Sequence, residues 1–152
     1  MALPNIFTNE ITEQLIARIN KLTPETKPLF GKMSVAQMLA HCNVTYEMVY
    51  ENNHPKPGVF TKFILKLIVK KIVTNELPYK PNARTAPQFL IVDERIFEKE
   101  KATLIAYIEK TQQQGESFFD QKESHSFGKL SAVEWNNMFY KHLNHHLGQF
   151  AV

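Results

Sequence analysis

The chain has 152 residues, of which 43% are hydrophobic and 22% are charged, and its formal net charge at pH 7 is +3. This composition is typical of one folded domain and excludes a disordered chain. The basic residues are spread along the sequence, which argues against a nucleic-acid partner. No apolar stretch reaches the roughly 18 to 20 residues of a membrane span, and the N-terminus lacks a signal-peptide pattern. We therefore expect a single cytoplasmic domain over residues 1–152.

Periodic apolar residues and capping signals predict five helical segments, and no hairpin pattern competes with them. Asn9 is the expected N-cap of the first segment, and Gly115 is expected to end the fourth. Capping boxes that begin at Ser34 and Ser131 open the second and the fifth. The fold class is therefore all-α. The expected segments are residues 10–22, 34–50, 59–73, 93–114 and 131–150.

The third segment, residues 59–73, is apolar along one broad side and carries lysines on the other. A basic amphipathic helix of this kind can lie on a membrane surface. We favour packing of its apolar side on the helix bundle or on a second subunit, and the latter predicts a homodimer. The apolar residues are Phe60, Phe63, Ile64, Leu67, Ile68 and Ile72.

Three histidines are expected to point into the core. Because each residue advances about 100° around an ideal helix, His142 and His146 lie in the middle of the apolar face of the last helix. His41 lies at the centre of an apolar face of the second helix. His145 falls at the edge of its face, so it is expected at the rim or in solvent. The opposite side of the last helix carries Asn137, Lys141, Asn144 and Gly148.

The spacing of these histidines suits a metal site. Residues four apart on a helix have Cβ atoms roughly 5 to 6 Å apart, within reach of one ion bound at about 2.0 to 2.1 Å. Three neutral nitrogen ligands from two helices would leave coordination positions open, as in catalytic sites. The alternative is three core histidines hydrogen-bonded to their neighbours, because a His-x-x-x-His pair alone is weakly specific. Helix geometry alone leaves both interpretations open.

Two stretches of the chain, residues 33–42 and 142–150, resemble the paired signature of the DinB/YfiT-like superfamily of metalloenzymes. Residues 85–90, and residues 127–131 together with Glu134 and Trp135, resemble one of its uncharacterised branches. The resemblance implies a DinB-like four-helix bundle with an additional helix between the second and third bundle helices. The chain departs from the usual pattern at the second helix cap, where it has Met33 and Gln37 in place of tryptophan and glutamate.

The resemblance also implies the ligands of a divalent metal ion, for which we expect zinc or nickel. The positions that match the superfamily's ligands are His41, His142 and His146. Gln149 matches a glutamine that often follows the last ligand, and it could orient a bound water or a ligand. Imidazole suits several divalent metals, so the residues alone do not select one.

Activities in that superfamily include thiol-dependent transferases and isomerases. The resemblance therefore implies a metal-dependent enzyme, with a thiol-dependent transferase as the expected kind and a small-molecule substrate such as a low-molecular-weight thiol. The alternative is a non-catalytic helical module that binds a ligand or partner and has structural histidines. No catalytic group is evident beside the ligands, because Glu134 serves a helix cap, Glu47 points away from His41, and Cys42 is expected to be a small core residue.

Overall fold

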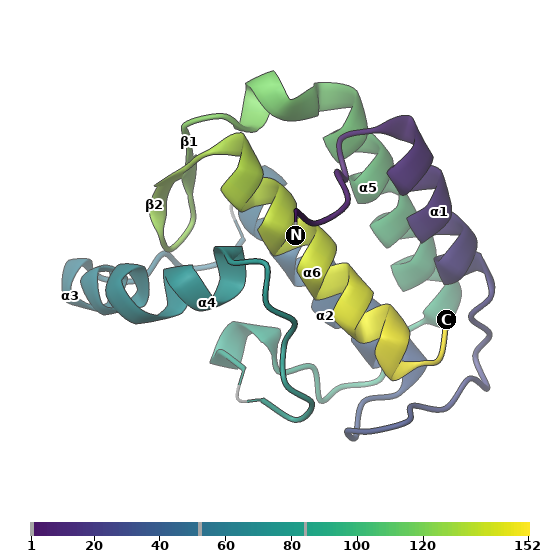
Figure 1. Cartoon of the computed structure of the whole chain (residues 1–152). Coiled ribbons are helices and arrows are strands. Elements are labelled where there is room, and N and C mark those ends of the chain that lie inside the picture. Colours follow the sequence, from purple (N-terminus) through teal and green to yellow (C-terminus); the bar gives the residue numbers. More distant parts are fainter. Residues whose placement is uncertain (1, 52, 84) are drawn as a thin grey trace.

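Four long helices pack around one hydrophobic core in this computed structural model, which describes residues 2–51, 53–83 and 85–152 (Figure 1). The chain is mostly helical, as the sequence predicts. The core holds the single tryptophan, Trp135, and the phenylalanines Phe119 and Phe139, whose rings contact one another. The four helices are α1 (Asn9–Asn20), α2 (Val35–Tyr50), α5 (Phe97–Phe119) and α6 (Ala132–Gln149).

Helix starts follow their capping signals, with one correction. The capping boxes at Ser34 and Ser131 are confirmed, and each serine accepts a hydrogen bond from the backbone three residues later. The predicted cap Asn9 is wrong by one residue. Thr8 has the extended backbone of an N-cap, and its hydroxyl accepts from the Ile11 amide. Asn9 is the first helical residue, and its amide donates to Glu13 at 2.7 Å.

Helix α5 differs from its prediction at both ends. It begins at Phe97 rather than near Asp93, and the Asp93 carboxylate pairs with Arg95 at 3.0 Å ahead of the helix. The sequence predicts that Gly115 ends this helix, and Gly115 does leave helical geometry, with a φ of 70°. The helix resumes and ends at Phe119, whose side chain is fully buried in the core.

A helical rod projects from the bundle between α2 and α5 (Figure 1). It consists of α3 (Val59–Ile64), the π-helical η1 (Leu65–Val69) and α4 (Lys70–Thr74), which together span the third predicted segment. The prediction that the apolar side of this segment packs on the bundle of its own chain is wrong, because six of its apolar side chains are 39–76% exposed. They are Phe60, Phe63, Ile64, Leu67, Ile68 and Ile72.

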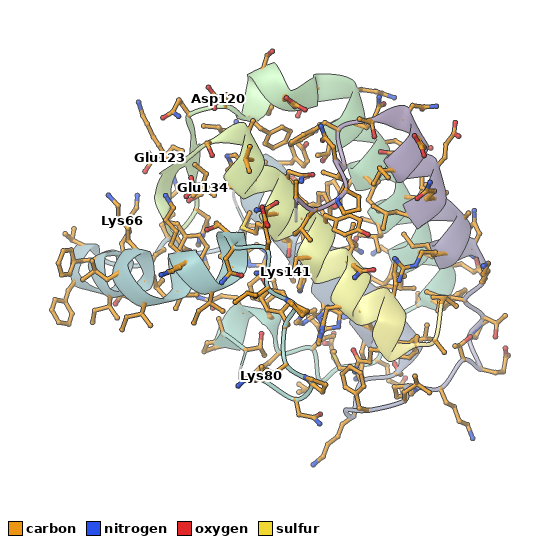
Figure 2. All side chains as sticks on the ribbon, in the orientation of Figure 1. Lys66, Lys80, Asp120, Glu123, Glu134 and Lys141 are labelled. Carbon is orange, nitrogen blue, oxygen red and sulfur yellow. The ribbon has the colours of Figure 1, made fainter. Side chains whose placement is uncertain are left out.

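The rod is fastened to the bundle through polar contacts. Lys62 pairs with Glu123 and Lys70 with Glu134, both at 2.8 Å. Lys141 lies between α6 and the end of α4 (Figure 2), where its ammonium donates to the Ile72 carbonyl at 2.5 Å and to both Asn75 oxygens. Lys141 is only 4% exposed, and burial lowers its pKa to about 8. The side of α6 opposite the histidines is therefore partly covered by the rod, which its polar sequence did not indicate.

A small antiparallel hairpin precedes α6 and corrects the expectation that the chain has no hairpin. Its strands are β1 (Lys122–Ser124) and β2 (Gly128–Leu130), with Lys122 paired to Leu130. Gly128 enters the second strand with a φ of 76°, a conformation that favours glycine, and the Ser124 hydroxyl donates to its carbonyl at 2.7 Å.

Helices in the described ranges are all too short or too polar to cross a bilayer.

Candidate metal centre

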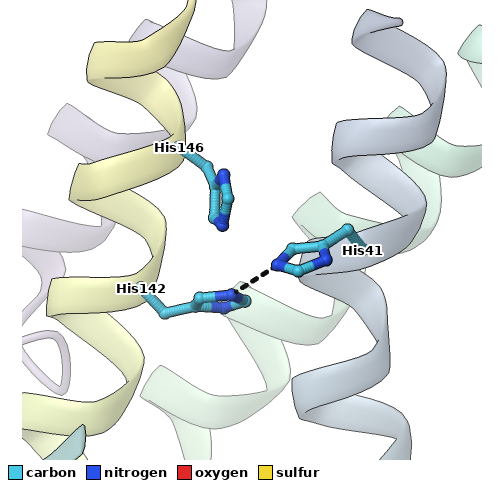
Figure 3. A group of neighbouring side chains, drawn as sticks. All are labelled: His41, His142 and His146. Carbon is cyan, nitrogen blue, oxygen red and sulfur yellow. Dashed lines mark hydrogen bonds between the residues drawn. The ribbon is translucent and has the colours of Figure 1, made fainter. Parts of the chain in front are cut away.

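Two helices bring three histidines together in the bundle. His41 comes from the middle of α2, and His142 and His146 come from successive turns of α6. One nitrogen from each ring lies within 4.8 Å of the others, and the Nε2 atoms of His41 and His142 are 3.0 Å apart. Figure 3 shows the three rings turned toward one another across the space between the helices. The structure thus places all three predicted site residues in one cluster that could hold a metal ion.

The outward nitrogen of each ring, Nδ1, is held by an oxygen atom. A carbonyl or amide oxygen only accepts hydrogen bonds, so His41 and His146 carry their proton on Nδ1 and keep a lone pair on Nε2. Such contacts to the outer nitrogen are the usual support of a histidine that binds metal. The oxygens are the Phe89 carbonyl at 2.8 Å from His41, Thr45 Oγ1 at 3.0 Å from His142, and Gln149 Oε1 at 2.8 Å from His146.

The donor set fits a divalent ion. The lone pair of His41 Nε2 points at His142 Nε2, which lies 3.0 Å away. Two arrangements of protons or ions make this contact favourable. Either His142 donates an Nε2 proton to His41 and accepts from the Thr45 hydroxyl, or both lone pairs bind a cation. Metal–nitrogen bonds of about 2.0 to 2.1 Å place ligand nitrogens roughly 3 to 4 Å apart, so only His146 would need to approach.

Burial keeps the three rings neutral near pH 7. Burial lowers the pKa of His41 and, with the neighbouring His146, holds the pKa of His142 well below its usual range. Burial and His41 lower the pKa of His146 to about 3. Neutral imidazole is the form that binds a metal, so the protein does not have to remove protons from these rings before binding.

The histidine cluster opens into a cavity of about 800 Å³ that is partly open to solvent. Its walls include residues of α2, α6 and the rod, and loop residues from 79–83 and 85–91. All three histidines line it, and so does Gln149. A ligand in the cavity could therefore reach the inner nitrogens, which a closed structural site would not allow.

The remaining histidines lie outside the cluster, as expected. His54 pairs with Glu47 at 2.7 Å, which agrees with the prediction that Glu47 points away from His41. His125 faces the His54 carbonyl at 3.3 Å. His145, expected at the rim or in solvent, is half-buried on the cavity wall, where its ring lies 4.9 Å from that of His146.

Gln149 supports a histidine in addition to lining the cavity. Its Oε1 accepts from His146, and its Nε2 donates to the Phe30 carbonyl at 2.8 Å. The Gln149 carbonyl also accepts from the Leu29 amide at 2.8 Å. Gln149 therefore orients the ring of His146, which agrees with the orienting role that the resemblance implies for it.

Two other supports of the histidines differ in how visible they are in the sequence. Thr45 follows His41 by four residues, so helix spacing places both on one face of α2. Phe89 contributes through its backbone carbonyl from η2 (Pro87–Phe89), and no side-chain pattern marks such a contact.

Cys42 is fully buried against Met38, and burial raises the pKa of its thiol far above its usual range, so it has the character of an inert core residue.

The chain belongs to a protein family of unknown function. That family is described as "Protein of unknown function (DUF1569)", and it matches residues 7–152. Comparisons with curated proteins and with solved structures give no match. Membership of an uncharacterised family is thereby shown, and the place of the chain in the DinB/YfiT-like superfamily stays a prediction.

We expect the metal-free protein to lose stability as the pH falls from about 6.5 towards 3. His146 has a pKa of about 3 when folded and 6.5 as a model group, so in this interval the unfolded chain binds a proton that the folded chain does not. At pH 5 this one residue should lower the free energy of unfolding by about 2 kcal/mol. Urea unfolding at pH 7 and pH 5 measures the effect, and His146→Gln should show a smaller decrease. An equal decrease in both proteins would contradict the assignment.

We expect Gln149→Leu to weaken zinc binding about 10- to 100-fold, because it removes the acceptor that orients His146. Competition with a chromophoric chelator measures the affinity. Gly148→Ala is the matched control, since a Cβ at Gly148 meets nothing within 4 Å and the residue is exposed. Zinc binding by Gln149→Leu as tight as by the control would show that Gln149 does not support the site.

Proposed function

We propose that this protein is a divalent-metal-dependent enzyme with a DinB-like fold, in which His41, His142 and His146 bind a zinc or nickel ion. One observation carries the proposal: three neutral imidazoles, with their outer nitrogens held by oxygens, turn their inner nitrogens toward one point on a cavity wall. Histidines buried only for packing would gain nothing from facing a cavity of about 800 Å³.

The proposed reaction is a transfer to or from a small molecule, with a low-molecular-weight thiol as the expected co-substrate. A divalent ion bound by the histidines would lower the pKa of a thiol or water bound to it. The cavity wall itself supplies few acids or bases. Of the described residues that line it, none is a carboxylate, and burial keeps the pKa of Tyr79 above its usual range, so beside the three ligands only His125 and His145 could exchange a proton near pH 7. The ligand histidines and their supports hold the geometry rather than move protons.

The same shortage of acids and bases favours a rival, a helical module that binds a ligand without transforming it. In that case the three histidines would be structural, held by the hydrogen bonds to Phe89, Thr45 and Gln149. The two functions differ in what removal of the ion does to the fold, because binding energy at a structural site is also folding energy.

We expect His146→Ala to lose tight metal binding and to remain a cooperatively folded helical protein. The core is built from apolar residues of all four bundle helices, so folding does not depend on a cation. Elemental analysis of protein purified without an affinity tag measures the bound metal, and circular dichroism melting measures the fold. Chelator-treated wild type is the companion sample. Largely unfolded protein at room temperature in both samples would support a structural site instead.

We also propose that a second copy of the chain covers the exposed apolar side of the rod. A membrane surface is the weaker candidate, because Lys62 and Lys70 are already paired with glutamates of their own chain. Two residues at the centre of the exposed side, Phe63 and Leu67, are 58% and 64% exposed. An exposed apolar surface of this kind usually marks an interaction site.

We expect the wild type to sediment as a dimer at micromolar concentration and Leu67→Glu to sediment as a monomer. The substitution places a charge where two apolar sides would meet, at a position that its own bundle does not cover. Analytical ultracentrifugation distinguishes the two states. A monomeric wild type would contradict the dimer without affecting the metal proposal.

A further inference from the structure

The rod contributes part of the wall of the cavity that the histidines line. Leu65, Val69 and Val73 recur every four residues, and all three line the cavity while being only partly exposed. The other side of the same rod carries the exposed residues Phe63 and Leu67. The rod is therefore apolar on two sides. The side that lines the cavity serves no purpose in packing the protein's own core.

The rest of the lining has the same character. Met33, Met48 and Val49 approach from the α2 side, and Met138 approaches from α6. Methionines adapt their shape to what they contact, which suits a wall that receives a variable apolar body. Lys32 is the single charged residue among the described residues of the lining.

We propose that the substrate of this site is an amphiphile: an apolar body fills the cavity, and a single anionic or neutral donor group points to the histidines. The part of this inference that concerns the donor group rests on the proposed metal function, and the part that concerns the apolar body does not. The volume of about 800 Å³ lies within the range of pockets that bind drug-sized molecules. A small hydrophilic molecule alone would leave the apolar walls in contact with water, which costs about 25 cal/mol per Å².

The charge of the donor group follows from the lining. A cationic group would find no carboxylate on the described part of the wall, and it would face the three imidazoles and any ion they hold. An anionic group would meet a favourable potential from a bound divalent ion and from Lys32. Carboxylates and thiolates satisfy this condition, and ammonium groups do not.

Trp135 makes occupancy of the cavity measurable. It is the only tryptophan of the chain, it is 1% exposed, and it lines the cavity. Because its indole lines the cavity, its fluorescence should respond when a ligand fills that cavity. The probes are hexanoate, octanoate and decanoate below their micelle concentrations, with octanol and octylamine as head-group controls, each titrated into zinc-loaded and metal-free protein.

We expect the affinity to rise about fourfold for each added methylene in both forms of the protein, because a buried methylene contributes about 0.8 kcal/mol. The preference for octanoate over octanol should be larger in the zinc-loaded form than in the metal-free form, where only Lys32 favours the anion, and octylamine should bind most weakly. Chain-length dependence without any zinc effect would uphold the amphiphile and reject the metal function. Tight zinc binding without chain-length dependence would overturn the amphiphile and leave the metal function standing.

A pair of substitutions on the rod locates the binding. Val69→Glu places a carboxylate on the cavity side and should reduce octanoate affinity at least tenfold, whereas Leu67→Glu, on the exposed side, should leave it within twofold. Val69→Phe narrows the cavity without adding a charge and serves as the second variant if Val69→Glu unfolds. Equal octanoate affinity in wild type and Val69→Phe, with helical content retained, would place the ligand elsewhere and overturn the proposal.

Discussion

The arrangement around the site depends on one constraint: three imidazoles lie inside an apolar bundle, and every polar nitrogen there needs a partner. The bundle helices supply two of these partners, Thr45 for His142 and Gln149 for His146. His41 takes the Phe89 carbonyl from the loop before α5, and Gln149 in turn holds the Phe30 carbonyl of another loop. Both irregular loops are fixed by these contacts. Gly31 shows how tight the second one is, because a Cβ there would lie 2.6 Å from the Gln149 amide nitrogen.

The cavity has a second origin, in how the rod is fastened. Lys62, Lys70 and Lys141 hold the rod at three points along its length through charge-assisted contacts, and none of these contacts draws its apolar residues into the core. A rod packed directly on α2 and α6 would close the space beside the histidines. Polar fastening instead leaves a gap with apolar walls. The volume of the cavity thus depends on which groups anchor the rod. Among these anchoring groups, the ammonium of Lys141 is the least exposed to solvent.

Features that depend on residues within one helix could be predicted from the sequence, and features that depend on contacts between distant segments could not. The histidines that converge were selected by helix periodicity, and both capping boxes lie where Ser34 and Ser131 predicted them. The failures have a common cause. Lys141 looks like a solvent-facing residue until α4 covers it, and α5 continues past Gly115 because Phe119 gains burial in the core. The hairpin was missed because its strands have three residues each, too few for an alternating pattern.

The separation between core and site bears on what the histidines are for. The core contacts of Trp135, Phe119 and Phe139 lie among side chains that carry no charge, so they would form with or without a cation. A structural metal site is normally closed by four protein ligands, whereas the described residues offer a group of three that lines a cavity. A fold that needs no cross-link can expose a ligand set to incoming molecules at no cost to its own stability. This division between an apolar core that folds the chain and a polar cluster that faces a cavity is what makes chemistry at the cluster the better-supported proposal.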